Sequence, residues 1–134
     1  MKITTGLSAN TTGSNDLSAT LRVHKDDFQL YNVIVENTFG HPIQQSQALA
    51  LSAYGLRQGF YASSFTGWQD TILTDIGSQY FGSCLVTGAT DYIFGETAAT
   101  YFKNADIQSL GKGYITAGRP KNDGTGNYTG ICES

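Results

Sequence analysis

Two aspartates occupy equivalent positions in successive segments of similar composition. Asp70 follows Gly67-Trp68-Gln69, and Asp91 runs directly into Tyr92-Ile93-Phe94, 21 residues later. If these segments stack as neighbouring β-strands, about 4.8 Å apart, both carboxyl groups lie on one face. Two carboxylates that close cannot both ionise at low cost, so the pKa of one rises while the other stays low. The pattern therefore predicts a proton donor beside an anionic nucleophile.

The simpler interpretation of either aspartate is a turn cap, because Asp beside Gly or Thr commonly has that role. Their shared offset favours chemistry, since Asp70 lies five residues after Phe65 and Asp91 lies five after Val86. The apolar residues that follow Asp91 also indicate a partly desolvated cleft wall. A serine hydrolase is not indicated, because the sequence contains no Gly-x-Ser-x-Gly elbow. His24 and His41 show no partner pattern, and we assign them no role.

The elements that must position the aspartates are short β-rich runs, because helical periodicity is nearly absent. Four runs, at residues 30–37, 59–67, 79–88 and 100–109, are bounded by Gly, Asn, Asp or Ser. Their equivalent apolar residues, with one more near the C-terminus, are Val35, Phe65, Val86, Ile107 and Ile131, separated by 30, 21, 21 and 24 residues. A near-constant step of this size is typical of a solenoid with one coil per repeat. We predict an all-β, right-handed parallel β-helix that forms a single domain over residues 1–134.

Several features of this prediction stay open at the level of sequence. An antiparallel sandwich also contains many short strands, although usually at closer spacing. The longer first step contains Gly40 to Ser52, where an additional loop and strand would fit. Within it, residues 44–51 are compatible with a strand or a helical turn. Residues 1–16 are rich in Ser, Thr, Asn and Gly, so we expect them to be loosely ordered.

Composition limits the partners that this chain can have. Of its 134 residues, 40% are hydrophobic and 14% charged, the net charge is −3, and the eight Lys and Arg never cluster, so nucleic-acid binding is not expected. No run of 18 apolar residues exists, so no membrane span is expected either. Cys84 and Cys132 could pair in an oxidising compartment. The triplets Asn10-Thr11-Thr12 and Asn127-Tyr128-Thr129 are compatible with secretion.

Three ordered motifs resemble the pectin methylesterase (pectinesterase) family. They are Gln47-Ala48-Leu49-Ala50-Leu51, Gln69-Asp70-Thr71-Ile72 and Asp91-Tyr92-Ile93-Phe94-Gly95, and their order and intervals match those of the family. Weaker similarity reaches Ser18-Ala19-Thr20, which looks more fungal, and Gly113–Ala117. The family's Leu-Gly-Arg-Pro-Trp motif has no counterpart, since Gly118-Arg119-Pro120 is followed by Lys121 and matches a different family segment. We therefore expect a central fragment of a longer pectinesterase β-helix.

The resemblance implies an extracellular enzyme that removes methyl esters from pectin without a metal or cofactor. Asp91 would attack the ester carbonyl as nucleophile, and Gln47 and Gln69 would stabilise the oxyanion. Asp70 would protonate methanol and then activate water as a base. Trp68 and Phe94 would contact the sugar, although Phe94 is equally compatible with a place in the core. Alternatives are a non-catalytic galacturonan-binding β-helix or an inactive fragment and, less well supported, a lyase or polygalacturonase.

Overall fold

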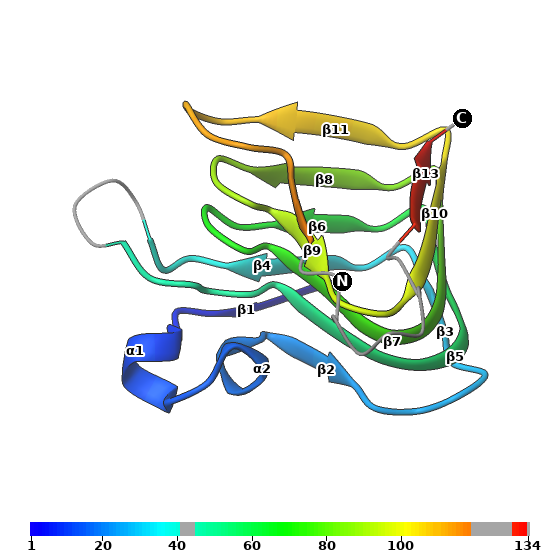
Figure 1. Cartoon of the computed structure of the whole chain (residues 1–134), viewed down its shortest axis with the longest axis horizontal. Coiled ribbons are helices and arrows are strands. Elements are labelled where there is room, and N and C mark those ends of the chain that lie inside the picture. The colour runs from blue at the N-terminus through cyan, green and yellow to red at the C-terminus, as the bar shows by residue number, and fades with distance from the viewer. Residues whose placement is uncertain (41–44, 119–129, 134) are drawn as a thin grey trace, which may run out of the picture.

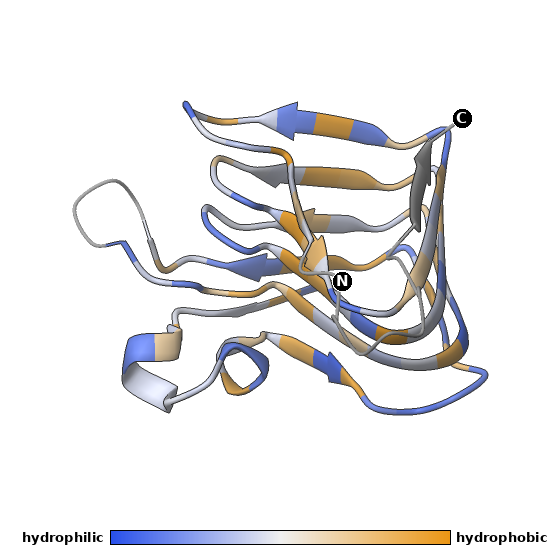
Figure 2. Ribbon diagram, in the orientation of Figure 1, coloured by the Kyte–Doolittle hydropathy of each residue, from blue (hydrophilic) through white to orange (hydrophobic). Residues whose placement is uncertain are grey.

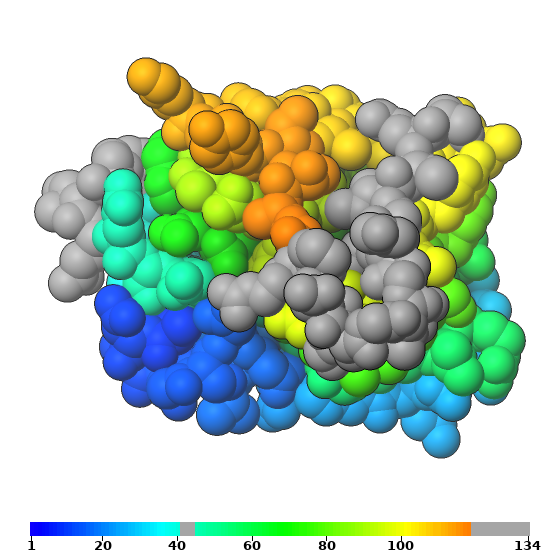
Figure 3. All heavy atoms as spheres, in the orientation of Figure 1, coloured from blue at the N-terminus to red at the C-terminus, as the bar shows by residue number. Residues whose placement is uncertain are grey.

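Each coil of the chain lies on the coil before it, and all strand pairs are parallel. The computed structural model describes residues 1–40, 45–118 and 130–133. Its strands are stacked in register from the N-terminus to the C-terminus (Figure 1). In the space-filling view the coils form successive bands of colour, with the N-terminal residues at one end of the stack (Figure 3). This arrangement confirms the predicted parallel β-helix and excludes the antiparallel sandwich.

Two stacked sheets form the walls of the solenoid. The first has the order β1 (Lys2–Thr5), β4 (Ile34–Asn37), β6 (Ser64–Thr66), β8 (Leu85–Gly88) and β11 (Asp106–Ser109). The second contains β2 (Leu21–Val23), β3 (Gln29–Tyr31), β5 (Leu51–Tyr61), β7 (Ile72–Gly82), β9 (Ile93–Gly95), β10 (Ala99–Lys103), β12 (Thr116–Gly118) and β13 (Gly130–Glu133). The long strands β5 and β7 each span the width that two shorter strands cover in other coils.

The apolar row predicted from the sequence is confirmed for four of its five members. Val35 pairs with Phe65, Phe65 with Val86, and Val86 with Ile107. The assignment of Ile131 to this row was wrong. Ile131 pairs with Thr100 and therefore continues the second sheet through β10 and β13.

A residue with positive φ divides each predicted β-rich run into two strands. These residues are Asn32, Ala62, Ser83 and Asn104, with φ of 56°, 47°, 51° and 50°. Their stacking is direct, because the N–H of Asn32 donates to the carbonyl of Tyr61 and that of Ala62 to the carbonyl of Gly82. The left-handed conformation turns the chain sharply from one sheet to the other, so the same corner recurs in every coil.

Side chains that point into the coils form a continuous core. The rings of Phe60, Phe81 and Phe102 stack with centroid separations of 4.8 and 4.6 Å, and all three are fully buried. Val35, Phe65 and Val86 fill the facing row and are also fully buried. Apolar positions recur from coil to coil on β8 and β11 (Figure 2). This stacked core fixes the register of the coils and therefore the positions of the residues between them.

The N-terminal region is ordered, so the expectation of loose order in residues 1–16 was wrong. Strand β1 pairs with β4, placing Ile3 beside Val35. Two short helices follow, α1 (Ala9–Thr12) and α2 (Asn15–Ser18). They cover an open side of the solenoid near the beginning of β5 (Figure 1). The N–H of Ala9 donates to the carbonyl of Gln47 at 2.8 Å, which ties α1 to that region.

Connections between the two sheets differ in length. The chain passes from Thr66 to Ile72 and from Gly88 to Ile93 by short segments, whereas Asn37 and Leu51 are joined by a longer one. Residues 45–50 form neither a helix nor an additional strand, and residues 41–44, which include His41, lie outside the described part. None of the described helices is long and apolar enough to cross a membrane.

Candidate active site

The short connections carry the two aspartates and place them in one column. Leu51 pairs with Ile72, and Ile72 with Ile93, so residues two positions earlier also stack. This register aligns Leu49, Asp70 and Asp91 in successive coils. The N–H of Asp91 donates to the carbonyl of the next coil at Tyr114, 2.7 Å away. The stacked carboxyls expected from the sequence are therefore adjacent along the axis.

Both aspartates adopt the left-handed backbone conformation. The φ of Asp70 is 60° and that of Asp91 is 48°. Asp and Asn are among the few residues that enter this region readily, because their short polar side chains bond locally. Backbone strain of this kind is frequent at functional sites, where surrounding structure holds it in place. Here the hydrogen bond from the N–H of Asp70 to the carbonyl of Thr90, at 3.0 Å, fixes the turn.

The two carboxyls have unlike surroundings. Asp70 is only 7% exposed and lies over the fully buried Leu49. Burial, followed by the nearby charge of Asp91, raises the pKa of Asp70 to about 7. Asp91 is half-buried. Asp70 is therefore the member of the pair that can hold a proton near neutral pH, as a proton donor must.

The raised pKa predicts that Asp70→Asn stabilises the fold above neutral pH. The native carboxyl keeps its proton up to about pH 7, whereas the unfolded one loses it near 3.8, so stability from this group is lost as pH rises between these values. The full pKa difference corresponds to about 4 kcal/mol, which water in the groove reduces to roughly 2 kcal/mol. Asn tolerates the backbone conformation, so the variant should be more stable by that amount at pH 8 and equal to wild type below pH 4.

Urea unfolding at several pH values measures this difference, and Asp106→Asn, at an exposed position of β11, is the matched control. A gain in stability that is the same at pH 4 and pH 8 would contradict the assigned pKa.

The two predicted glutamines lie in adjacent coils beside the aspartates. Gln69 forms a parallel bridge with Thr90, directly before the aspartate column. Its carbonyl accepts the N–H of Ala48, so Gln47 and Gln69 belong to neighbouring coils. Both are half-buried. An amide side chain adds hydrogen-bond donors without adding charge, which suits the neighbourhood of an anionic nucleophile.

Asp70 opens onto a groove of about 880 Å³. Leu73 and Phe94 form its apolar part and pack with the buried Leu49 and Ala19. Phe94 thus combines both roles that its sequence context allowed, since it packs against the core and lines the groove. The remaining lining residues are Ser14, Asn15, Asp16, His24, Tyr54, Asp75, Gly95, Glu96, Ala117 and Gly118.

Trp68 lies in a different cavity. It lines a space of about 340 Å³ together with Asn37, Phe39, Thr66 and Leu110, among others. Its ring approaches the backbone so closely that a Cβ on Gly111 would lie 3.1 Å from it. The predicted sugar contacts of Trp68 and Phe94 therefore belong to two separate spaces in the structure.

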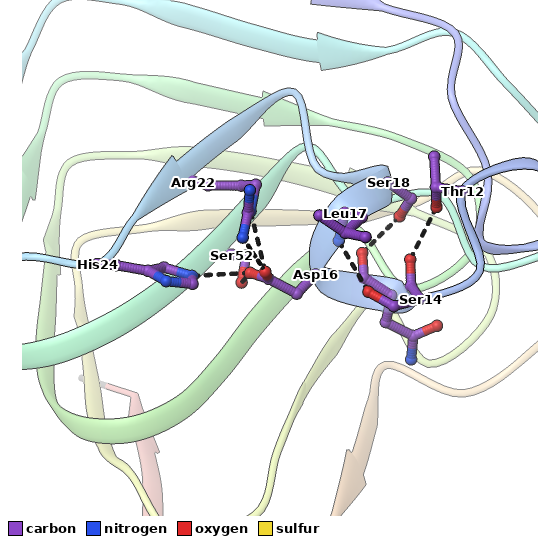
Figure 4. A network of polar contacts seen from close by, with 9 residues as sticks. Thr12, Ser14, Asp16, Leu17, Ser18, Arg22, His24 and Ser52 are labelled. Carbon is purple, nitrogen blue, oxygen red and sulfur yellow. Dashed lines mark hydrogen bonds and ion pairs between the residues drawn. The ribbon is translucent and has the colours of Figure 1, made fainter.

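One wall of the groove contains a charged network that the sequence did not reveal. Asp16, from α2, accepts hydrogen bonds from Arg22 Nε at 2.9 Å and Ser52 Oγ at 2.7 Å, and its other contact is His24 Nε2 at 2.8 Å (Figure 4). Burial alone would raise the pKa of Asp16, but these hydrogen bonds lower it to about 2. The view that His24 has no partner was wrong, because its partner lies in a helix that composition did not indicate.

Sequence reasoning also missed Asp75 and Glu96, although a signal existed. They are 21 residues apart, which is the spacing of the two central aspartates. Both line the groove, and the N–H of Thr97 donates to the carbonyl of Asp75 at 3.2 Å. Acidic residues that repeat with the coil period are therefore candidates for the groove even outside the family motifs.

Other sequence expectations fall partly outside the described chain. Cys84 is buried, and burial raises the pKa of its thiol. The side chain of Cys132 lies outside the described part, so its pairing with Cys84 stays a prediction. Arg119 also lies outside the described residues. Within residues 1–40, 45–118 and 130–133, no three His, Cys, Asp or Glu side chains gather closely enough to hold a metal ion.

These features define a parallel β-helix protein with a stacked aspartate pair at the edge of a groove. A family model described as Pectinesterase matches residues 1–132. The chain belongs to the pectinesterase family.

Individual relatives show how far the similarity extends. Probable pectinesterase A of Neosartorya fischeri is 47% identical over 115 residues, which are 86% of this chain and 34% of that protein. The crystal structure of the pectin methylesterase from Aspergillus niger is similar over 100% of this chain and 45% of its own, with TM-score 0.88 and 37% identity. A pectin methylesterase in complex with a hexasaccharide covers 99% of this chain and 48% of its own, with TM-score 0.79 and 25% identity. The chain thus spans about a third of the length of the curated relatives it matches.

Proposed function

We propose that this chain is the part of a secreted pectin methylesterase that carries the catalytic aspartates, and that it hydrolyses methyl esters of galacturonan to methanol and pectate. The observation that carries the proposal is the column in which Asp70, with its raised pKa, lies next to Asp91. Family membership supports the reaction class. The related structure with a bound hexasaccharide supports a polysaccharide ligand.

In the proposed reaction, an ionised Asp91 attacks the carbonyl carbon of the methyl ester. The carbonyl π electrons move to oxygen, and the amides of Gln47 and Gln69 donate hydrogen bonds to that oxyanion; one such donor is typically worth about 3 kcal/mol. When the carbonyl reforms, the bond to methoxide breaks and protonated Asp70 gives its proton to the leaving oxygen. Methanol departs and leaves an acyl–aspartate anhydride.

The second half of the reaction reverses these roles. Asp70, now ionised, removes a proton from water as the water attacks the galacturonyl carbon of the anhydride. The bond to Asp91 breaks, releasing the galacturonic acid and restoring the ionised nucleophile, while Asp70 is again protonated. No metal or cofactor takes part in this scheme. Phe94 beside the groove, and Trp68 beyond it, would contact sugar rings.

Methanol release from highly methylated pectin tests the proposal directly. The folded chain should release methanol in proportion to enzyme concentration and should release none from fully demethylated pectin. Circular dichroism on the same preparation establishes that the β-helix is intact. A folded chain that binds methylated pectin without releasing methanol would contradict hydrolysis and favour a galacturonan-binding β-helix instead.

A further inference from the structure

The groove contains a second column of polar side chains, five residues further along the strands than the aspartate pair. Asp75 and Glu96 occupy this column in successive coils, and Tyr54 lies in the coil before them. All three line the groove. At about 3.3 Å per residue, five residues correspond to roughly 16 Å along a strand. The second column is therefore placed to meet units of a bound polysaccharide that neighbour the reacting unit.

Carboxylates concentrate around this column. The pKa of Tyr54 is raised, first by the hydrogen bond between its phenol and Asp75, then by burial, and then by the charges of Asp75, Asp16 and Glu96. Three carboxyl groups from three coils thus act on one phenol. Of these, Asp16 has Arg22 as a salt-bridge partner, whereas no Lys or Arg is among the described residues that line the groove.

A methyl-esterified galacturonate unit and a free one differ by one negative charge. Beside Asp75 and Glu96 an ionised unit meets like charge, and juxtaposed like charges oppose binding. A neutral methyl ester avoids this repulsion, and its methyl group finds apolar surface on Leu73 and Phe94.

Resting on the proposed esterase function, we propose that Asp75 and Glu96 are specificity-determining residues that make the groove select methyl-esterified units beside the reacting one and reject ionised units. The groove would then bind its polymer most tightly in esterified regions and release it as carboxylates accumulate.

The test measures binding rather than turnover, using the full chain and isothermal titration calorimetry. The probes are fully methyl-esterified and fully de-esterified oligogalacturonates of equal length. The wild-type chain should bind the esterified probe about tenfold more tightly at low ionic strength, and salt should reduce this preference. Asp75→Asn combined with Glu96→Gln should reduce the preference to about twofold, mainly through tighter binding of the de-esterified probe.

The matched control is Asp26→Asn combined with Asp106→Asn, which changes the net charge equally at exposed positions that do not line the groove. This control should keep the wild-type preference. Equal binding of both probes by wild type, a preference unchanged in the groove variant, or no binding of either probe would each overturn the proposal. Methanol release, measured in parallel, separates the two hypotheses: selective binding without methanol supports selection by the groove and contradicts hydrolysis.

Discussion

Replacing Asp91 by Asn should lower kcat for methanol release at least about a thousandfold, because an amide cannot replace the attacking carboxylate and loss of a nucleophile has effects of this size or larger. Asn keeps the size of the side chain and tolerates a φ of 48°. The fold should therefore persist. Binding of methylated oligogalacturonates should change little, since the nucleophile contributes mainly to the transition state.

Three measurements on this variant separate chemistry from folding. Initial rates of methanol release give kcat, calorimetry gives the affinity for the methylated oligomer, and thermal unfolding reports stability. Asp106→Asn carries the same chemical change at an exposed position of β11 and should retain wild-type activity. Activity of Asp91→Asn within tenfold of wild type would exclude Asp91 as nucleophile and would return the aspartate to the role of a turn residue.

The second large effect concerns pH. Asp70 must be protonated to donate to methanol, and its pKa is about 7. Above that value, kcat/KM should fall by about tenfold per pH unit, so that it is about a hundredfold lower at pH 9 than at its plateau. The sign follows from the acid role: ionisation removes the proton that the leaving group requires. The parameter kcat/KM is the appropriate one, because it reports the free enzyme and the first chemical step.

Rates of methanol release at low substrate concentration, corrected for spontaneous ester hydrolysis, give this profile. In Asp70→Asn the remaining activity should be low and should lack the decline near pH 7. A wild-type kcat/KM that stays constant up to pH 9 would show that Asp70 is not the donor. The stability of Asp70→Asn at pH 8, predicted to exceed that of wild type, provides an independent check of the same pKa.

Much of the architecture could be predicted because the fold repeats itself. Each coil buries one apolar residue per row, so the spacing of Val35, Phe65, Val86 and Ile107 reports the stacking directly. The same period places the two aspartates at one offset in successive coils, which is visible in the sequence alone. Spacing cannot show which of two sheets a strand joins, however. Ile131 fits the period approximately but pairs in the other sheet.

The corners of the coils were less predictable. Asn32 and Asn104 are residue types that enter the left-handed region readily, whereas Ala62 and Ser83 adopt it without a local signature. Their conformation follows from the stack, because the corners above and below them impose the same turn. A propensity derived from one residue cannot include that constraint.

Contacts that do not repeat could not be predicted at all. Asp16 and Ser52 are 36 residues apart, and their hydrogen bond depends on the placement of a four-residue helix that has no periodic pattern. His24 was without a role for this reason. Asp75 and Glu96, in contrast, carried a periodic signal in the sequence, and the groove gives that signal a meaning.

The short connections that hold Asp70 and Asp91 have a consequence for how this chain tolerates length changes. One residue inserted between Gly88 and Asp91 would shift Asp91 out of its column while leaving the sheets on either side able to pair. Such a lesion would remove the chemistry and keep the fold. The longer segment between Asn37 and Leu51 carries no such register requirement, so insertions and deletions should accumulate there among homologues. Sequence drift in this solenoid is thus expected to be uneven, with one coil free to vary in length and two held to a fixed count.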